Sequence, residues 1–359
     1  MCELGHDPCG GSEVILKQDI LLLKRAGVPT RIYAHAARAG SPVSTLPMRT
    51  NLPLASSLEY CGRFLLSEHR GLLLGCNEPT LVALAPNRSI VRFDFTTPLP
   101  RYYRLPFWLG RFQRGTYLFP SKNEKRIFHE QHPLIPDQRS HVVPYAIDTE
   151  IFRPVRQGEP SGQRVGFAGQ FVHIKGIRVL LDAWKSVKSK LPAPELRLAG
   201  GPGLWKNASG IDSDCADLGQ RVAEMAAAGM LMTVGELKRT EMPAFWNTIT
   251  VAVVPSLCEA FGLVALEALA CGVPVIASDV GGLPEIVENG KSGILVPPND
   301  PKALADALIT LLTDEPLRRQ LASGARQRAE QFSLATRSAS LIKLFQQQIG
   351  QRGNGHSRI

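Results

Sequence analysis

Short runs of β-branched and aliphatic residues alternate with longer amphipathic segments along most of the chain. The short runs predict strands over residues 30–34, 89–93, 116–120, 142–145, 164–168, 196–199, 230–234, 251–254, 273–277 and 293–296. The longer segments predict helices over residues 12–26, 58–74, 177–190, 218–228, 241–246, 261–270, 285–288, 301–312, 315–331 and 333–348. Because strands and helices alternate in both halves, the pattern predicts an α/β fold of two doubly wound domains that face each other across a cleft.

A polar stretch rich in glycine and proline, VRQGEPSGQ, separates the two halves near residue 155. We expect an N-terminal domain over residues 1–155, a C-terminal domain over 156–332, a helix over 333–349 that packs back on the first domain, and a disordered tail over 350–359. Such domains normally open with a strand, and only nine residues precede the Gly10-Gly11 turn. The first strand of the N-terminal domain is therefore missing from the prediction.

The net charge of +9 permits attraction to phosphates, nucleic acid or an anionic membrane surface, and does not choose among them. Seven cysteines are scattered without a CxxC pair, which indicates a reduced cytoplasmic setting rather than a disulfide framework. Apolar runs fall short of the ~20 residues that span a bilayer, and MCELGHDPCGG lacks the pattern of a signal peptide. We expect a cytoplasmic protein, with the inner face of the membrane as an alternative location.

The stretch from Val251 to Pro284 concentrates the candidate chemistry. It reads as strand, acidic loop, helix, strand and glycine-rich turn, with Glu259 at the mouth of the helix and Glu267 within it. A carboxylate inside so apolar a helix is costly unless it has a partner. The stretch therefore predicts a partner for the Glu267 carboxylate, either a hydrogen-bond donor or a cation.

Three further positions carry candidate chemistry. Gly10 and Gly11 lead into a helix N-terminus, where backbone N–H groups and the helix dipole favour an anion. Lys175 lies at a loop–helix junction, where its ammonium group can meet a phosphate. Asp94 follows a strand, and sites in open α/β sheets lie beyond the carboxyl ends of strands. An ordinary loop, a solvated lysine and a strand-end cap are the alternative interpretations.

Other polar clusters give competing signals. Residues 101–126, RYYRLPFWLGRFQRGTYLFPSKNEKR, interleave basic and aromatic side chains, which is typical of membrane-interface segments; buried aromatics with solvated arginines are the alternative. His129 and His132 lack the HExxH pattern of a metal site and are interpreted as structural. The Asp212–Asp214 triplet has a metal-binding spacing but lies in an irregular polar segment. We therefore expect no metal and no nucleic-acid partner.

The stretch PSLCEAFGLVALEALACGVPVIASDVGGLPEIV, followed by GKSGILVPPNDPKALADAL, resembles the C-terminal domain of family 4 retaining glycosyltransferases of the GT-B fold, the glycosyl transferases group 1. GFAGQFVHIKGIRVLLDAW, GGPG, VPYAIDTEIFRP and GGSE also resemble segments of that family. Glu259 and Glu267 fall on its E-x7-E motif. The spacing alone carries no weight, so the resemblance depends on the long stretch in register around it.

The resemblance implies roles for these residues. The donor would be a sugar nucleotide held mainly by the C-terminal domain. Glu267 would accept hydrogen bonds from the ribose hydroxyls, Glu259 would face the donor sugar, and Lys175 would neutralise the departing diphosphate. The donor-binding set also includes Ala260, Phe261 and Gly262, whose backbone N–H groups would lie close to the sugar and diphosphate, together with Leu263.

In the first domain, Gly10 and Gly11 match the family and would bring a helix N-terminus to the same phosphates. The sequence departs from the family pattern in two places. The family usually carries an arginine at the position of Gln170, which can donate a hydrogen bond but has no charge. The usual first-domain histidine is not evident, and Asp94 is the nearest candidate for a catalytic group there.

The resemblance therefore implies a metal-independent, retaining glycosyltransferase that moves a hexose from a UDP-sugar or GDP-sugar to a hydroxyl acceptor, without a further cofactor. The basic aromatic segment adds the hypothesis of a lipid-linked acceptor or a growing cell-surface glycan, with peripheral membrane association. A sugar-nucleotide epimerase of the same fold and a catalytically weak nucleotide-sugar-binding protein are the alternatives.

Overall fold

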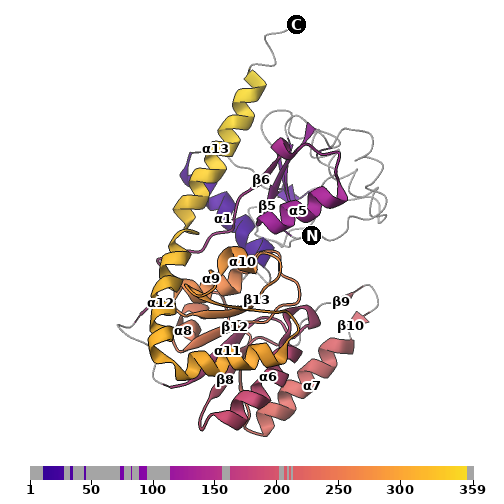
Figure 1. Cartoon of the computed structure of the whole chain (residues 1–359). Coiled ribbons are helices and arrows are strands. Elements are labelled where there is room, and N and C mark those ends of the chain that lie inside the picture. Colours follow the sequence, from indigo (N-terminus) through magenta and orange to yellow (C-terminus); the bar gives the residue numbers. More distant parts are fainter. Residues whose placement is uncertain are drawn as a thin grey trace. The chain divides into compact units, whose positions relative to one another are not determined.

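The structure is a computed structural model that describes residues 11–27, 33–34, 44–45, 73–76, 82, 89–94, 114–155, 162–201, 206–207, 210–211 and 213–353 (Figure 1). The chain forms two compact units. Unit 1 comprises residues 1–146 and 334–359, and unit 2 comprises residues 147–333. The division falls before the predicted linker because Ile147 forms a β-bridge with Ser333 and Phe152 is buried within unit 2.

Unit 1 is built on a parallel sheet of the order β3-β4-β5-β6. Its strands are β3 (Leu73–Cys76), β4 (Ser89–Arg92), β5 (Thr116–Phe119) and β6 (Ser140–Val142). Two sequence predictions are wrong here. Leu73 and Leu74 begin a strand rather than end a helix, and β6 stops at Val142 rather than continuing to Tyr145. A separate short pair joins β1 (Tyr33–Ala34) and β2 (Ser44–Thr45).

The two faces of this sheet carry different apolar clusters, because side chains alternate along each strand. One cluster gathers around Phe128 of α5 (Lys122–Gln131): Val82, Val91, Phe93, Tyr117, Phe119 and Ile135. The other joins Ile90 and Leu118 of the sheet to Leu23 of α1 (Gly11–Arg25) and to α13 (Leu334–Gly353). The Ser121 hydroxyl accepts the Glu124 N–H at 3.1 Å and so caps the start of α5.

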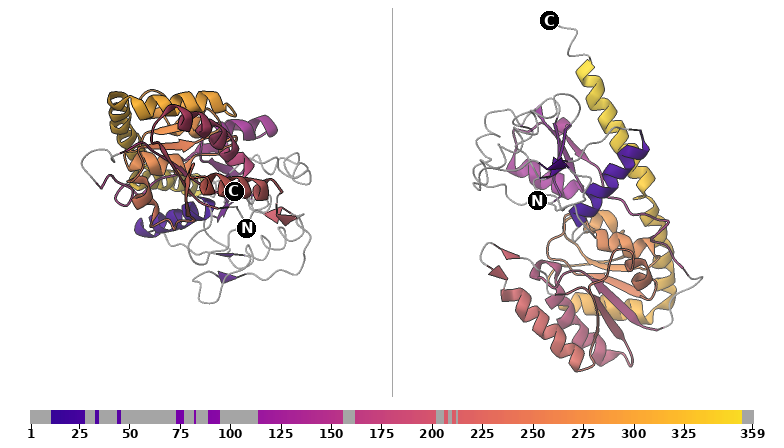
Figure 2. Two further views of the ribbon diagram at one scale, coloured as in Figure 1. Left: turned by 90° about the horizontal axis from the view of Figure 1, so that it is seen from below. Right: turned by 180° about the vertical axis from the view of Figure 1, so that it is seen from behind.

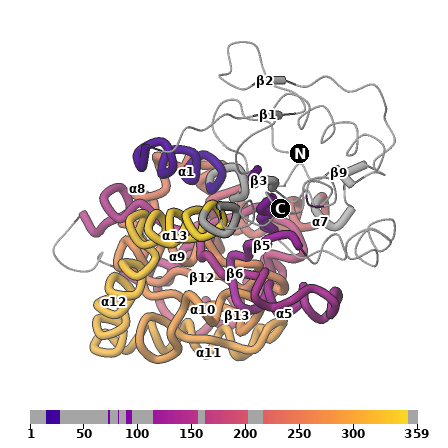
Figure 3. The backbone as a smooth tube through the Cα atoms, turned by 90° about the horizontal axis from the view of Figure 1, so that it is seen from above, coloured from indigo at the N-terminus to yellow at the C-terminus, as the bar shows by residue number. Residues whose placement is uncertain are grey.

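The C-terminal helix α13 therefore completes unit 1. It lies beside α1 in all views (Figures 1 and 2), and Figure 3 shows the two helices adjacent when seen from above. Leu341, Leu344 and Phe345 are the α13 residues that pack into the cluster. Gly10 and the residues before it, for which the sequence predicts no strand, lie outside the described residues, and Gly11 is the first residue of α1.

Unit 2 contains a parallel sheet of the order β11-β8-β7-β12-β13-β14. Its strands are β7 (Arg164–Ala168), β8 (Glu195–Ala199), β11 (Met232–Gly235), β12 (Val251–Val254), β13 (Val275–Ser278) and β14 (Gly293–Val296). A short antiparallel pair, β9 (Lys206–Asn207) and β10 (Gly210–Ile211), lies outside this sheet. β12 and β13 are buried along their whole length, as expected for central parallel strands with apolar runs.

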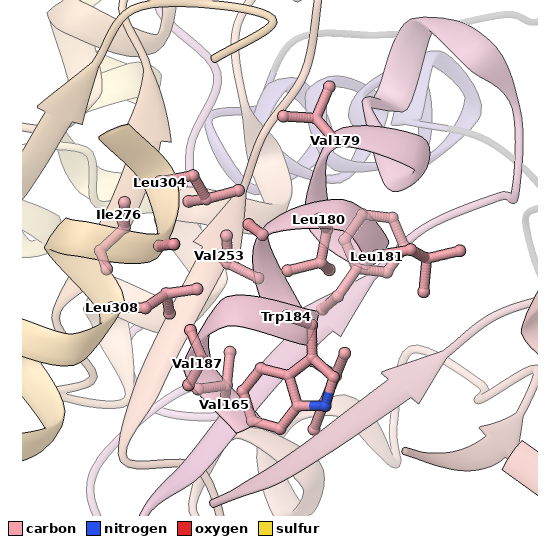
Figure 4. Packing of buried hydrophobic residues seen from close by; sticks show 14 of the residues in the cluster. Val165, Val179, Leu180, Leu181, Trp184, Val187, Val253, Ile276, Leu304 and Leu308 are labelled. Carbon is pink, nitrogen blue, oxygen red and sulfur yellow. The ribbon is translucent and has the colours of Figure 1, made fainter. Parts of the chain in front are cut away.

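Helices cover this sheet and form an extended apolar core with it. They are α6 (Ile177–Lys190), α7 (Ser213–Ala227), α8 (Met242–Trp246), α9 (Leu263–Ala270), α10 (Leu283–Ile286), α11 (Pro301–Thr313) and α12 (Glu315–Glu330). Val253 and Ile276 of the sheet pack with Trp184 of α6 and Leu308 of α11 (Figure 4). The Trp184 indole N–H donates to the Met230 carbonyl at 2.7 Å, so this buried ring has its polar partner.

Helix starts in unit 2 follow the sequence signals only in part. Asp300 accepts the Ala303 N–H at 2.9 Å and so caps α11, with Pro301 as the first helical residue. Thr240 would be a favourable N-cap by residue type, but the residue before α8 is Glu241, and its side chain makes no capping hydrogen bond. Both unit sheets nevertheless have the predicted α/β character.

Candidate active site

Three loops meet at the carboxyl ends of neighbouring strands of unit 2. They follow β7 (residues 169–176), β12 (255–262) and β13 (279–282). The Leu257 N–H donates to the Ile174 carbonyl at 2.8 Å, and the Gly282 N–H donates to the Glu259 carbonyl at 2.9 Å. Backbone hydrogen bonds therefore join all three loops around the acidic stretch, at the edge of the sheet where α/β proteins place their sites.

Glycines make this close approach possible. A Cβ atom on Gly176 would lie 1.8 Å from the Pro255 carbonyl oxygen, and one on Gly281 would lie 1.8 Å from the Glu259 carbonyl oxygen. Both glycines have positive φ, of 66° and 58°. Larger residues would be strained in conformation and would also collide with the backbone that carries Glu259.

Lys175 and Glu259 form an ion pair within these loops. The Lys175 Nζ lies 2.7 Å from Glu259 Oε2, and the Ser256 hydroxyl donates to the same oxygen at 3.2 Å. The side chains of Lys175 and Glu259 are 33% and 16% exposed, so the pair is partly desolvated but still open to a ligand. The structure thus brings together two residues that the sequence analysis assigned to the same reaction.

Helix α9 begins directly after this loop. Gly262, with φ of 105°, starts the helix, and within the described residues no side chain caps it. Leu263 is the first helical residue, and Ala260 and Phe261 lie just before it. The helix N-terminus therefore contributes a positive dipole end beside the Lys175–Glu259 pair.

Glu267 lies one turn further along α9 and is 5% exposed. Arg239 Nη1 donates to Glu267 Oε1 at 2.9 Å, and the Arg239 guanidinium lies 5.2 Å from the centre of the Phe152 ring. Burial raises the pKa of Glu267, and the charge of Arg239 acts in the opposite direction. Arg239 is thus the partner that the sequence predicts for Glu267 in its apolar helix.

Sequence reasoning missed Arg239. Arg239 follows the carboxyl end of β11, a strand of the same sheet. This position after a strand is the sequence signal that could have marked Arg239 as a site residue. One Arg239 nitrogen, Nη2, is buried without a hydrogen-bond partner among the described residues. Arg239 therefore retains a donor beside the carboxylate that was expected to bind ribose.

Gln170 occupies the same edge of the sheet. It directly follows Gly169 at the end of β7, and it is exposed. The Gly169 N–H donates to the Ala199 carbonyl at 2.9 Å, which fixes the start of the loop against β8. The structure places a neutral amide, rather than a cation, at this position.

Asp94 lies in unit 1 within a buried charge cluster, which we define as Asp19, Arg92, Asp94, Tyr145 and Arg337. Arg92 Nε donates to Asp94 at 2.6 Å, and the Tyr145 hydroxyl also donates to Asp94. Arg337 and Arg92 both donate to Asp19, at 2.7 and 2.8 Å respectively. These contacts favour the strand-end structural role for Asp94, and we omit it from the proposed catalytic set.

The remaining candidates for a metal site are the two histidines of α5 and its C-terminal end and the Asp212–Asp214 triplet. His129 lies on α5 with Nε2 3.7 Å from an Asp137 oxygen, and burial lowers its pKa. Asp212 lies outside the described residues, so the structure leaves the Asp212–Asp214 triplet untested. In the part of the chain that the structure describes, no three His, Cys, Asp or Glu side chains are grouped to hold a metal. No described helix has the length and apolar character needed to cross a bilayer.

A pocket of about 380 Å³ lies elsewhere on unit 2. Its lining includes Trp246, Thr250 and Cys271, with Arg319 and Arg326 from α12. Thr250 precedes β12, so this pocket opens at the amino ends of the strands. We do not assign it to the three-loop site, which lies at the carboxyl ends.

Comparison with known proteins identifies the family. The model of the family described as glycosyl transferases group 1 matches residues 148–328, a segment that carries Lys175, Arg239, Glu259 and Glu267. The chain belongs to this family. The resemblance noted in the sequence is thereby confirmed.

Curated relatives of this glycosyltransferase family member are about one-third identical to it. The D-inositol 3-phosphate glycosyltransferase of Jonesia denitrificans is 34% identical over 241 residues, which cover 62% of this chain and 55% of the relative. The protein of the same name from Corynebacterium glutamicum is 34% identical over 227 residues, or 60% and 53%. The chain spans about half the length of the curated relatives it matches.

Solved structures show the GT-B fold. A sucrose-phosphate synthase from Thermosynechococcus elongatus is similar with a TM-score of 0.74 at 21% identity, covering 97% of this chain and 96% of that chain. HepE from Anabaena, in complex with UDP-glucose, is similar with a TM-score of 0.73 at 19% identity, covering 94% and 96%. The prediction of two Rossmann-like domains with parallel sheets is confirmed.

Proposed function

We propose that this protein transfers a hexose from a nucleotide-sugar donor to a hydroxyl acceptor. The observation that carries the proposal is the Lys175–Glu259 pair, held 2.7 Å apart where three loops meet. A sugar nucleotide presents a diphosphate and sugar hydroxyls, and an ammonium group beside a carboxylate matches both. Membership of the glycosyl transferases group 1 supports the same reaction class.

The donor is proposed to be a UDP-sugar, with a GDP-sugar as the alternative. HepE, whose fold is similar, was solved in complex with UDP-glucose, which supports testing uridine nucleotides first. Glu267 would accept the ribose hydroxyls, and the unpartnered Arg239 nitrogen could donate to the nucleotide beside it. Gly10, Gly11, Gln170 and residues 260–263 complete the proposed donor set.

The reaction is proposed to retain the anomeric configuration and to need no metal. Departure of the nucleoside diphosphate places negative charge on its terminal phosphate. Lys175 and the N-terminal dipole of α9 would stabilise that charge more strongly as it grows, which lowers the barrier rather than only tightening binding. Retention rests on the sequence resemblance to family 4 enzymes.

The acceptor hypothesis rests on the basic aromatic segment 101–126. The described part of this segment contains both buried and exposed side chains. Tyr117 and Phe119 are buried in the sheet of unit 1, while Arg126 on α5 is exposed. We propose a lipid-linked acceptor presented at a membrane surface. Flotation of the protein with anionic liposomes at low salt tests this, and failure to float removes the support.

A donor screen tests the central proposal. Thermal unfolding is measured with UDP-, GDP-, ADP- and TDP-sugars, because a ligand that binds the native state raises its apparent stability. Glu267→Ala should weaken binding of the identified donor by at least about tenfold, or ~1.4 kcal/mol. Glu224→Ala, at an exposed glutamate of α7, is the matched control and should bind normally. Unchanged donor affinity in Glu267→Ala would refute the ribose role.

Product analysis then separates the reaction classes. A glycosyltransferase needs an acceptor and gives at most slow hydrolysis of the donor alone, whereas an epimerase converts the donor without any acceptor. Donor binding without transfer to any fraction of a cell extract would instead support a catalytically weak binding protein.

A further inference from the structure

The two charged groups that the proposed function assigns to the donor are bonded to each other in the ligand-free protein. Lys175 Nζ lies 2.7 Å from Glu259 Oε2. A diphosphate and the Glu259 carboxylate are both anions, so they compete for this ammonium group. Within the described residues, Lys175 is the cation that contacts Glu259.

Hydrogen bonds within the loops hold Glu259 next to the position of Lys175. The Leu257 N–H donates to the Ile174 carbonyl at 2.8 Å, which ties the neighbours of the two residues together. Ser256 donates to the same Glu259 oxygen at 3.2 Å, and the Gly282 N–H holds the Glu259 carbonyl at 2.9 Å. Glu259 therefore stays close when an anion binds Lys175.

This proximity has a consequence for what can bind. If a diphosphate takes the ammonium group, the Glu259 carboxylate loses a charged partner and faces a like charge. A hexose attached to the diphosphate carries hydroxyl groups that can donate to Glu259 and replace the lost contact. A free nucleoside diphosphate, which is the product of transfer, lacks these donors.

Resting on the proposed function, we propose that Glu259 competes with the diphosphate for Lys175 and thereby makes tight binding depend on the sugar. The complete donor satisfies both partners of the ion pair, whereas the free nucleoside diphosphate satisfies only Lys175. Glu259 thus promotes release of the spent nucleotide. Gln170 strengthens this dependence, because it adds no positive charge at the loop after β7.

The test measures affinity for diphosphates in Glu259→Gln, which keeps the shape and removes the charge. Inorganic pyrophosphate, UDP and UDP-glucose are titrated calorimetrically at fixed ionic strength. Glu259→Gln should bind pyrophosphate about three- to tenfold more tightly than the natural protein, the range expected for releasing a partly exposed ion pair. The affinity advantage of UDP-glucose over UDP should shrink in the same variant, and transfer should be impaired.

Two matched variants separate the possible causes. Glu224→Gln removes the same charge at an exposed position of α7 and should leave pyrophosphate affinity unchanged. Lys175→Gln should lose pyrophosphate binding. Pyrophosphate affinity that is equal or lower in Glu259→Gln overturns the competition. Because pyrophosphate has no base or sugar, this result decides the inference even if UDP-glucose binds neither protein, an outcome that would count against the proposed donor alone.

Discussion

The Arg239–Glu267 pair allows a prediction in which stability and pH are linked. In Arg239→Gln the buried carboxylate of Glu267 loses its cation. Breaking a fully buried pair costs about 3–5 kcal/mol. The Arg239 side chain is 27% exposed and that of Glu267 is 7% exposed, so water can partly replace the lost partner. We therefore expect a loss of about 1–3 kcal/mol at neutral pH.

The pH dependence follows from the native pKa of Glu267. Burial raises this pKa above the ordinary value of 4.5, and Arg239 opposes the rise. A carboxyl group with a raised native pKa holds its proton longer in the folded state than in the unfolded state. Its contribution to stability is fully present below pH 4.5 and is lost as the pH rises through the native pKa. Without Arg239 the pKa rises further, so the variant loses more stability at neutral than at acidic pH.

The assay is urea unfolding of the natural protein and Arg239→Gln at acidic and neutral pH. Arg178→Gln is the matched control, because it breaks a more exposed pair in the same unit, with side chains 44% and 62% exposed. That control should cost at most about 1 kcal/mol and show little pH dependence. An Arg239→Gln loss that is equal at both pH values, or no larger than the control, would refute the reasoning.

Two further substitutions probe unit 1 and the three-loop site. Arg337→Met should destabilise unit 1 by about 3–5 kcal/mol, measured by denaturant unfolding, because the buried cluster then holds the carboxylates of Asp19 and Asp94 with Arg92 as their remaining arginine partner among the described residues. Gly281→Ala should sharply reduce transfer, because its Cβ would displace the Glu259 backbone. Gly229→Ala has a similar φ of 67° with no atom within 4 Å of the new Cβ, so it should cost about 1 kcal/mol of stability with normal turnover.

Much of the fold could be predicted from the sequence, because buried parallel strands are short continuous apolar runs. β7, β12 and β14 appear at the predicted residues. The sequence pattern places Leu73 and Leu74 in a helix because a short apolar run does not distinguish the period of a helix from that of a strand. Leu73 and Leu74 form a strand because β3 pairs with β4. This pairing is a tertiary contact, which the local sequence pattern does not contain.

The site could be predicted only as far as single segments allow. Glu259 and Lys175 were found because each stands in a recognisable loop. The pairing of Arg239 with Glu267 depends on where β11 and β12 lie in the sheet. The local sequence around either residue does not contain this information. The contacts of Asp94 are equally hidden from local pattern, since its neighbour Arg92 belongs to a cluster closed by Arg337 from the far end of the chain.

The division of the chain has a consequence for its synthesis. Unit 2 is one continuous segment, whereas unit 1 is assembled from segments on both sides of it. Asp19 leaves the ribosome 318 positions before Arg337, its buried partner. Translation of unit 1 begins first, but unit 1 is complete only after α13 has been synthesised. Unit 2, the enclosed unit, is complete before α13 is synthesised. We therefore expect the enclosed unit to mature before the N-terminal unit, which is the opposite of the usual order during translation.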